Sequence, residues 1–305
     1  MTWRLAALNF GLRSLGRPVI KRTKSAPRAR RDLTLTSRLF FRGSRGHATR
    51  RELGGVRVRD ITPPGADAEN VLLYFHGGGY VAGSSRTHLP MLGHLAKRSR
   101  TRAILPDYRL APEAPFPAAF DDAVAVWRGL RDEGVPADRI VLGGDSAGGG
   151  LALALLSQVL AEGERPAGLF GLSPWTDLTL SGQSLEENAK LDAILPGERV
   201  EELRDMVAPD IDPTDPRISP LFAKFDGAPP VYLQVSETEI LRDDALRMAE
   251  RLREQGVEVQ VDTWPDTPHV WHLFLGWIPE ANEAMDRVAE FSQRCFKSAR
   301  PQSES

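Results

Sequence analysis

A serine flanked by glycines is the first pattern in this chain that could do chemistry. Residues 144–148 read Gly-Asp-Ser-Ala-Gly, between an apolar run that ends at Leu142 and a helical pattern that begins at Ala147. A serine on a sharp strand-to-helix turn presents its hydroxyl above the sheet, where it can act as a nucleophile. A glycine-flanked serine can also be a simple helix N-cap. The strand before it and the helix after it predict that Ser146 is a nucleophile.

Three successive glycines follow a second predicted strand. Residues 71–75 are a short apolar run, and His76-Gly-Gly-Gly-Tyr80 comes directly after it. Such glycines let the backbone aim its N–H groups at one point, as stabilisation of an anionic oxygen requires. We predict an oxyanion hole made by the amides of Gly78, Gly79 and Ala147, the alternative being a glycine turn chosen only for tightness. Neither glycine-rich stretch has the spacing of a nucleotide-binding loop, so no cofactor is expected.

The predicted general base is His269, which lies in Asp266-Thr-Pro-His-Val-Trp-His272 after the strand-like residues 257–264. It stands late enough in the chain for the order serine, acid, histidine, and His272 is its near rival. Two histidines three residues apart could also bind a metal, but no carboxylate or cysteine stands at ligand spacing, so no metal site is expected. His76 is interpreted as bracing the glycine loop. The remaining histidines are interpreted as surface or satisfied core groups: His47, His88 and His94.

The acid that would orient the histidine should follow the apolar run at 231–235. Four carboxylates are available there: Glu237, Glu239, Asp243 and Asp244. Asp243 and Asp244 stand where the helical pattern 245–255 begins, so helix capping explains them without catalysis. Glu239 has no such structural duty. A carboxylate bonded to His269 would hold its tautomer and stabilise the imidazolium, and we favour Glu239 with Asp243 as the open alternative.

These candidates all follow buried runs of the kind that form parallel strands. The apolar runs lie at 71–75, 103–105, 140–142, 169–172 and 231–235, and helical patterns alternate with them at 89–98, 120–131, 147–162, 245–255 and 279–296. The alternation predicts an α/β fold with a mostly parallel central sheet, helices on both faces and active groups at the carboxyl ends of the strands. Residues 56–61 alternate in polarity like a half-exposed edge strand.

The domain organisation follows from where this rhythm stops. We predict an N-terminal basic helical cap segment at 1–50, a catalytic domain at 51–298 and a tail at 299–305. Residues 181–220 are rich in acids and prolines and interrupt the strand–helix alternation. They are interpreted as an insertion that forms a cap over the site together with residues 1–50.

Charge is distributed unevenly along the chain. Residues 1–59 hold sixteen Lys and Arg against two acids, which leaves −16 on the rest of a chain with net charge −2. One interpretation is a basic arm for anionic lipid or nucleic acid. The favoured one is an amphipathic cap whose cations face water or the acidic body, because Leu and Phe recur there at helical spacing. No nucleic-acid partner is expected, since the aromatic interleaving typical of such surfaces is absent.

The expected location is cytoplasmic. The apolar stretch near the N-terminus is broken by Arg4, Arg13 and Arg17, and no cleavage site follows it, so neither a signal peptide nor stable membrane insertion is expected. The single cysteine, Cys295, cannot form an internal disulfide, which fits a reducing compartment.

Taken together, the motifs resemble those of the bacterial hormone-sensitive-lipase-like (family IV) esterases of the α/β-hydrolase superfamily. The resemblance covers about residues 56–295. It rests on His76-Gly-Gly-Gly, Asp107-Tyr-Arg-Leu-Ala-Pro-Glu113, Gly144-Asp-Ser-Ala-Gly-Gly149, Ser173-Pro-Trp-Thr-Asp177 and the segment that ends at His272. Many members carry Asp-Pro-Leu-x-Asp at the acid, and this alignment places Glu239 where their catalytic Asp lies. The glutamate is a departure from the family pattern.

The resemblance implies the α/β-hydrolase fold and hydrolysis of short-chain acyl esters through an acyl-enzyme intermediate. It also implies a confined acyl pocket, for which Tyr80, Trp175 and Trp271 are candidate lining residues, although each could equally belong to the core. A homodimer through a sheet edge is common among similar proteins. Two alternatives remain: the same triad acting on a lactone, amide or N-acetyl group, and a non-catalytic small-molecule receptor of the same fold.

Overall fold

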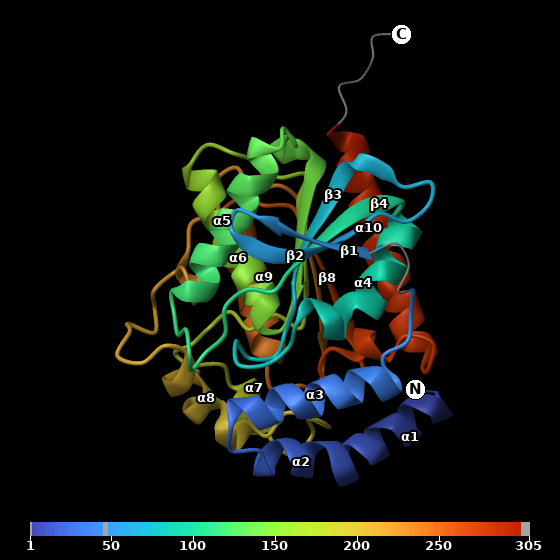
Figure 1. The fold of residues 1–305 in the computed structure, drawn as a ribbon. Helices are drawn as coiled ribbons and strands as arrows, with labels where there is room; N and C mark the ends of the chain where they lie inside the picture. Colours follow the sequence, from blue (N-terminus) through green and yellow to red (C-terminus); the bar gives the residue numbers. More distant parts are fainter. Residues whose placement is uncertain (1, 45–47, 300–305) are drawn as a thin grey trace.

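The computed structural model describes residues 2–44 and 48–299 and contains an eight-stranded sheet (Figure 1). The strands lie in the order β1-β2-β4-β3-β5-β6-β7-β8. Their bounds are β1 Ala48–Leu53, β2 Val56–Ile61, β3 Asp67–Phe75, β4 Thr101–Pro106, β5 Ile140–Asp145, β6 Gly168–Leu172, β7 Val231–Ser236 and β8 Val259–Trp264. β1 pairs with β2 and β2 with β4 in antiparallel fashion, and the pairs from β4 to β8 are parallel.

The parallel strands are covered on both faces, as their apolar runs predict. On one face lie α5 (Ala118–Asp132), α6 (Ala147–Ala161) and α9 (Arg242–Glu254), and on the other lie α4 (Ser85–Ser99) and α10 (Pro279–Ser298) (Figure 1). The first layer buries Trp127 and Leu155 in one apolar cluster, and the second buries Leu92 and Met285 in another. The fold class predicted from the sequence is confirmed.

The N-terminal helices and the mid-chain insertion pack together at one end of the molecule (Figure 1). The helices are α1 (Trp3–Gly11), a π-helical turn (Leu12–Gly16), α2 (Arg17–Arg22) and α3 (Ala26–Phe40), and the insertion carries α7 (Ser184–Glu187) and α8 (Val200–Val207). Arg13 donates to the carbonyl of Leu191 at 2.9 Å, and Lys21 pairs with Glu198 at 2.6 Å. Part of the basic N-terminus therefore faces the acidic insertion. None of the helices in the described residues is long and apolar enough to cross a bilayer.

One detail of the predicted organisation is wrong. Residues 56–61 are not the edge strand, because β1 pairs along their outer side from Ala48 to Leu53. The predicted boundary between residues 50 and 51 consequently falls inside β1. Of the predicted tail, only Ala299 lies within the described residues, and His47 lies outside them. A homodimer through a sheet edge stays a prediction.

Candidate active site

Ser146 occupies a strained turn between β5 and α6. Its backbone has φ 52° and ψ −125°, a conformation that costs a non-glycine residue of the order of 1–3 kcal/mol. Two hydrogen bonds fix the turn: Ser146 N–H donates to the carbonyl of Leu172, and Trp175 N–H donates to the carbonyl of Ser146, at 2.9 and 3.0 Å. The side chain is partly exposed at the carboxyl end of the sheet.

The flanking glycines are required by the close approach of three backbones. A Cβ on Gly144 would lie 2.2 Å from the carbonyl oxygen of Gly148, and a Cβ on Gly148 would lie 2.1 Å from that of Phe75. Phe75 and Gly144 are also register partners in the adjacent parallel strands β3 and β5. The glycine loop after β3 and the serine turn after β5 therefore leave the sheet side by side.

The glycine loop turns with two left-handed residues, Gly78 at φ +118° and Gly79 at φ +61°. Within the described residues, neither of their N–H groups donates a hydrogen bond to the protein. Ala147 is the first residue of α6, so its N–H has no acceptor one turn earlier in the helix. These three amides are the ones the sequence singled out, and their donors remain available to a bound oxygen.

A buried polar network holds this loop from behind. The carboxylate of Asp145 accepts hydrogen bonds from the Tyr74 hydroxyl and the Gly77 N–H, at 2.7 and 2.9 Å, and lies 3.3 Å from His88 Nε2. The His76 ring stacks between those of Tyr108 and His88, with centroids 4.3 and 5.5 Å away.

His76 thus braces the loop as predicted, and burial lowers its pKa to about 4. His88 is a hydrogen-bonded core group, as the sequence analysis allowed. Sequence reasoning missed Asp145 itself, although it stands beside the serine.

His269 and Glu239 are paired. His269 Nδ1 lies 2.6 Å from Glu239 Oε2, and the other carboxylate oxygen accepts the Ser236 N–H at 2.6 Å. Burial by itself would lower the pKa of His269, but the hydrogen bond and charge of Glu239 outweigh it and raise the pKa above its ordinary value. Glu239 is completely buried and His269 nearly so.

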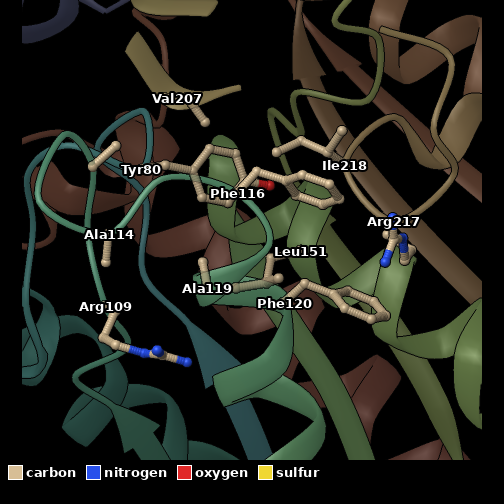
Figure 2. Close-up of a pocket in the computed structure, with 11 residues that line it drawn as sticks. Tyr80, Arg109, Ala114, Phe116, Ala119, Phe120, Leu151, Val207, Arg217 and Ile218 are labelled. Carbon is tan, nitrogen blue, oxygen red and sulfur yellow. The ribbon is translucent and has the colours of Figure 1, made fainter. Parts of the chain in front are cut away.

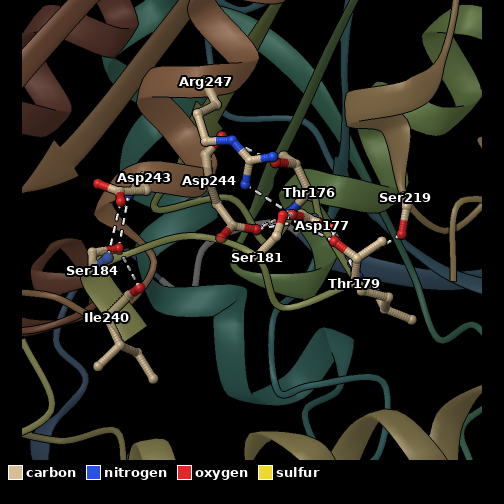
Figure 3. A network of polar contacts seen from close by, with 11 residues as sticks. Thr176, Asp177, Thr179, Ser181, Ser184, Ser219, Ile240, Asp243, Asp244 and Arg247 are labelled. Carbon is tan, nitrogen blue, oxygen red and sulfur yellow. Dashed lines mark hydrogen bonds and ion pairs between the residues drawn. The ribbon is translucent and has the colours of Figure 1, made fainter. Parts of the chain in front are cut away.

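The competing carboxylates are engaged elsewhere (Figure 3). Asp243 accepts the Ser184 N–H at 2.9 Å, and Asp244 accepts the N–H groups of Thr176 and Asp177 at 2.7 and 2.9 Å. Burial raises the pKa of Asp244 to about 7. Neither group hydrogen-bonds to His269 in the described part of the chain.

The rival histidine also has a different partner. His272 Nε2 lies 2.7 Å from the side-chain oxygen of Gln234, and burial lowers the pKa of His272 to about 3. It is therefore a neutral core group at ordinary pH. Across residues 2–44 and 48–299, no cluster of three or more His, Cys, Asp or Glu side chains could hold a metal ion.

The insertion anchors the loop that carries Glu239. Asn188 Nδ2 donates to the Glu239 carbonyl at 2.9 Å, and Ile240 N–H donates to Asp192 at 3.0 Å. Sequence reasoning did not find Asn188 or Asp192, because they lie in a segment without regular periodicity. Their contacts hold the acid loop from the side of the cap.

A narrow, mainly apolar pocket of about 10 Å³ lies between the segment that follows the glycine loop, α6 and the end of α8, and Ser146, His269 and Glu239 are not among its lining residues (Figure 2). Tyr80 follows the glycine loop, Leu151 lies in the second turn of α6, and Val207 ends α8. The other lining residues are Arg109, Ala111, Ala114, Phe116, Ala119, Phe120, Arg217 and Ile218.

The three aromatic candidates for pocket lining differ in position. Tyr80 lines the pocket, and the Trp175 ring packs 6.3 Å from the Tyr80 ring as part of the core behind it. Trp271 does not line the pocket: it is completely buried in an apolar cluster with Leu5 and Trp264, which fits the core alternative left open by the sequence. Its position under α1 explains the difference.

Comparisons with known proteins agree with this geometry. The family described as the alpha/beta hydrolase fold matches residues 72–273. An esterase of Acinetobacter venetianus is 38% identical over 242 residues, covering 79% of this chain and 80% of the relative. An acetyl-hydrolase of Streptomyces hygroscopicus is 34% identical over 229 residues, covering 75% and 77%. A crystal structure of an esterase from the bacterial hormone-sensitive lipase family superposes with a TM-score of 0.92 at 37% identity, covering 97% of this chain and 99% of that one.

These matches join the nucleophile turn and the glycine loop to one group of enzymes. The chain belongs to the α/β-hydrolase fold family and, within it, to the hormone-sensitive-lipase-like esterases. It is a carboxylic ester hydrolase that acts on small-molecule esters.

Proposed function

We propose that the protein hydrolyses short-chain acyl esters through a triad of Ser146, His269 and Glu239. The observation that carries the proposal is the pairing of His269 Nδ1 with Glu239 Oε2 at 2.6 Å, in a chain whose Ser146 stands on a strained turn between strand and helix. A histidine bonded through Nδ1 to a carboxylate keeps Nε2 free to accept a proton. The raised pKa of His269 marks a ring whose protonated form is stabilised.

In the first half of the reaction, Ser146 Oγ attacks the ester carbonyl carbon while His269 takes the hydroxyl proton. The carbonyl oxygen becomes an anion, and the N–H groups of Gly78, Gly79 and Ala147 stabilise it. The tetrahedral intermediate collapses, the carbon–oxygen bond of the alcohol breaks, and His269 returns the proton to the leaving alkoxide. In the second half, His269 deprotonates water, which attacks the acyl carbon; the bond from that carbon to Ser146 Oγ then breaks, the acid leaves, and His269 returns the proton to Ser146 Oγ.

The test of the nucleophile is Ser146→Ala with p-nitrophenyl butyrate as reporter. We expect turnover to be abolished and covalent labelling by a fluorophosphonate to disappear, with the melting temperature retained. Ser157→Ala is the matched control, because Ser157 lies on the same helix away from the turn. Full activity in the first variant would refute the assignment, and a wild type that no fluorophosphonate labels would favour a non-catalytic receptor.

The preference for short acyl groups rests on the pocket. A volume of about 10 Å³ is room for roughly one water molecule, so an alkyl chain enters only if the walls move, and each further carbon requires more movement. The walls Phe116, Leu151 and Val207 are apolar, which suits an alkyl chain. The acetyl-hydrolase among the relatives is in line with this preference.

An acyl-length series on aryl esters tests the preference. The wild type should favour acetate to about butanoate, and Val207→Ala should shift the optimum by about one or two carbons, since it removes two methyl groups from the wall. Val200→Ala makes the same change on α8 at a residue outside the pocket lining and should leave the profile unchanged. Lactones and aryl amides belong in the same screen, and faster turnover of either would move the proposal to that bond. A cytoplasmic location is also part of the proposal, supported by Cys295 as a buried free thiol.

A further inference from the structure

The N-terminal helices leave large apolar side chains in water. Eight of the eleven large apolar residues that are exposed in the described part of the chain lie between Trp3 and Phe40. Four of the eight are more than two-thirds exposed: Trp3 at 77%, Phe10 at 74%, Leu15 at 72% and Leu39 at 71%. The others are Val19, Ile20, Leu35 and Phe40. Such a concentration on one small segment marks an interaction surface, whereas single exposed apolar residues are ordinary.

Packing against the body does not explain these residues. α1 turns Leu5 and Asn9 inward, where both are buried, and keeps Trp3 and Phe10 outside. The beginning of α1 and the end of α3 meet at one turn, since Thr2 donates to Glu280 at 3.1 Å and Trp277 Nε1 donates to the Phe40 carbonyl at 2.7 Å. Figure 1 shows α1 and α3 running along the same end of the molecule. We call the exposed side chains of residues 3–42, together with Trp277, the cap face.

The cap face is strongly cationic. Residues 2–44 contain eleven Lys and Arg against a single acid, Asp32. Within the described residues six of these cations form no ion pair with a carboxylate: Arg4, Arg13, Arg22, Lys24, Arg38 and Arg42. The Arg42 guanidinium instead lies 3.7 Å from the centroid of the exposed Trp277 ring. Arginines beside exposed aromatic and aliphatic groups can rest their stems on the apolar surface while their charged ends reach anions.

Charge distinguishes among the occupants of such a surface. A second copy of the chain in a two-fold interface would bring unpaired cations against unpaired cations, which opposes association. A nucleic acid would satisfy the charges but would leave Leu15, Leu39 and the other aliphatic side chains without partners. An anionic lipid bilayer satisfies both, because aliphatic and Trp side chains enter the headgroup boundary while Lys and Arg bind lipid phosphates and carboxylates.

We propose that the cap face docks the protein onto the surface of an anionic lipid bilayer, with α1 and α3 lying in the plane of the headgroups. The proposal goes beyond the esterase activity and does not depend on the triad. It also differs from membrane spanning, for which no described helix is suited.

Docking would hold the reaction site near the lipid. The Asn9 side chain donates to the Asp266 carbonyl at 2.5 Å, and Arg30 donates to the Val81 carbonyl at 2.9 Å. The cap helices therefore rest on the loop before His269 and on the loop after the glycines. Esters partitioned into the bilayer would meet the enzyme at this surface.

Vesicle co-sedimentation of the full chain tests the proposal, with esterase activity on a soluble aryl acetate as the check that each variant is folded. Vesicles of phosphatidylcholine containing about a third phosphatidylserine should bind the wild type, and pure phosphatidylcholine should bind it about tenfold more weakly. Raising the salt to about 0.5 M should weaken binding to the anionic vesicles, because counter-ions screen exposed charges. The triple variant Trp3→Ser, Phe10→Ser, Leu39→Ser should lose about tenfold in vesicle affinity while keeping its activity.

Phe222→Ser is the matched control, since Phe222 is also exposed but lies outside the cap face, and it should bind vesicles like the wild type. Equal binding by the wild type and the triple variant, or no binding of the wild type to anionic vesicles, would overturn the proposal. A wild-type dimer that the triple variant dissolves, without any vesicle binding, would assign the cap face to a second copy and overturn it as well.

Discussion

Replacing Glu239 with glutamine tests whether the triad needs a carboxylate that accepts hydrogen bonds with both of its oxygens. Each carboxylate oxygen of Glu239 has one donor: Oε1 accepts the Ser236 N–H and Oε2 faces His269 Nδ1, both at 2.6 Å. Glutamine offers a single acceptor and one NH₂ group. If the oxygen keeps Ser236, the NH₂ points at His269 Nδ1 and favours the tautomer with the proton on Nε2, which cannot act as the base.

The size of the effect follows from these contacts. A wrong tautomer at a comparable serine–histidine–acid site lowers kcat by about 10⁴, and we expect a loss of about 10³ to 10⁴ here. The hydrogen bond and charge of Glu239 are what raise the pKa of His269, so this pKa should fall when Glu239 loses its charge.

The pH profile of kcat/KM shows the direction in which the pKa of His269 changes. Neutral His269 is the proposed base, so activity is lost as pH falls through the pKa of the ring. Burial lowers this pKa, and Glu239 more than compensates and raises it. Removing the charge leaves the effect of burial, so the acid limb of the profile should move to lower pH beneath a much lower plateau.

Asp243→Asn is the matched control. Asp243 accepts the Ser184 N–H and pairs with Arg242, away from His269. The acid limb of the pH profile of Asp243→Asn should therefore coincide with that of the wild type. The assay is initial-rate hydrolysis of p-nitrophenyl acetate between about pH 4 and pH 9. An unmoved acid limb in Glu239→Gln, or an equal shift in Asp243→Asn, would refute the reasoning.

Three further outcomes follow from the site. Gly78→Ala should lower kcat about 10²- to 10³-fold, because Gly78 has φ +118° and an added Cβ would lie 2.4 Å from the Ala82 carbonyl oxygen. Gly11→Ala is the control and should leave kcat unchanged, since an added Cβ there would have nothing within 4 Å. Asp145→Asn should keep most of the activity and melting temperature, since one oxygen can still accept from both Tyr74 and Gly77. Asp145→Leu leaves these two buried donors unpaired, at about 1–3 kcal/mol each, and should lower both the activity and the melting temperature. Equal behaviour of the two variants would contradict this account. Burial raises the pKa of Asp244 to about 7, so its contribution to stability is present below the ordinary carboxyl pKa and is lost as pH rises through about 7. We therefore expect the stability of Asp244→Asn relative to the wild type to be higher at about pH 8 than at about pH 5, as measured by the midpoints of urea unfolding.

The features that could be predicted from the sequence have short-range causes. The apolar runs at 140–142 and 231–235 form buried strands because side chains without polar groups are stable on both faces of a covered sheet. The turn at Ser146 follows from glycines that only a tight strand-to-helix crossing requires. These local preferences account for the parts of the fold that the sequence predicted.

The edge of the sheet shows where local reasoning stops. β1 reads Ala-Thr-Arg-Arg-Glu-Leu, and of these only Leu53 is buried, so its polarity carries no strand period. Its pairing with β2 comes from backbone hydrogen bonds that any sequence can form. Residues 56–61 show the clearer strand pattern because they lie inside the sheet, between β1 and β4.

The acid and the pocket depend on contacts between distant segments. Glu239 and Asp243 are only four residues apart in sequence. What separates their roles is a hydrogen bond from the N–H of Ser184, in the insertion, to Asp243, which lies 59 residues later. The pocket is closed by Phe116 and Val207, whose backbones bond at 2.8 Å although neither lies in a regular apolar pattern. Spacing along the chain contains no signal for such pairs.

The packing of α1 also constrains how the molecule assembles as it is synthesised. Thr2 bonds to Glu280, 278 residues later, and Asn9 bonds to the Asp266 carbonyl, 257 residues later. α1 is therefore synthesised well before residues 266–280, and contacts this distant in sequence form late. Until those residues have followed, the side of α1 that will face them stays open to chaperones and to other chains. The same contacts place α1 on the loop before His269, so this part of the site is completed only after residues 266–280 have been synthesised.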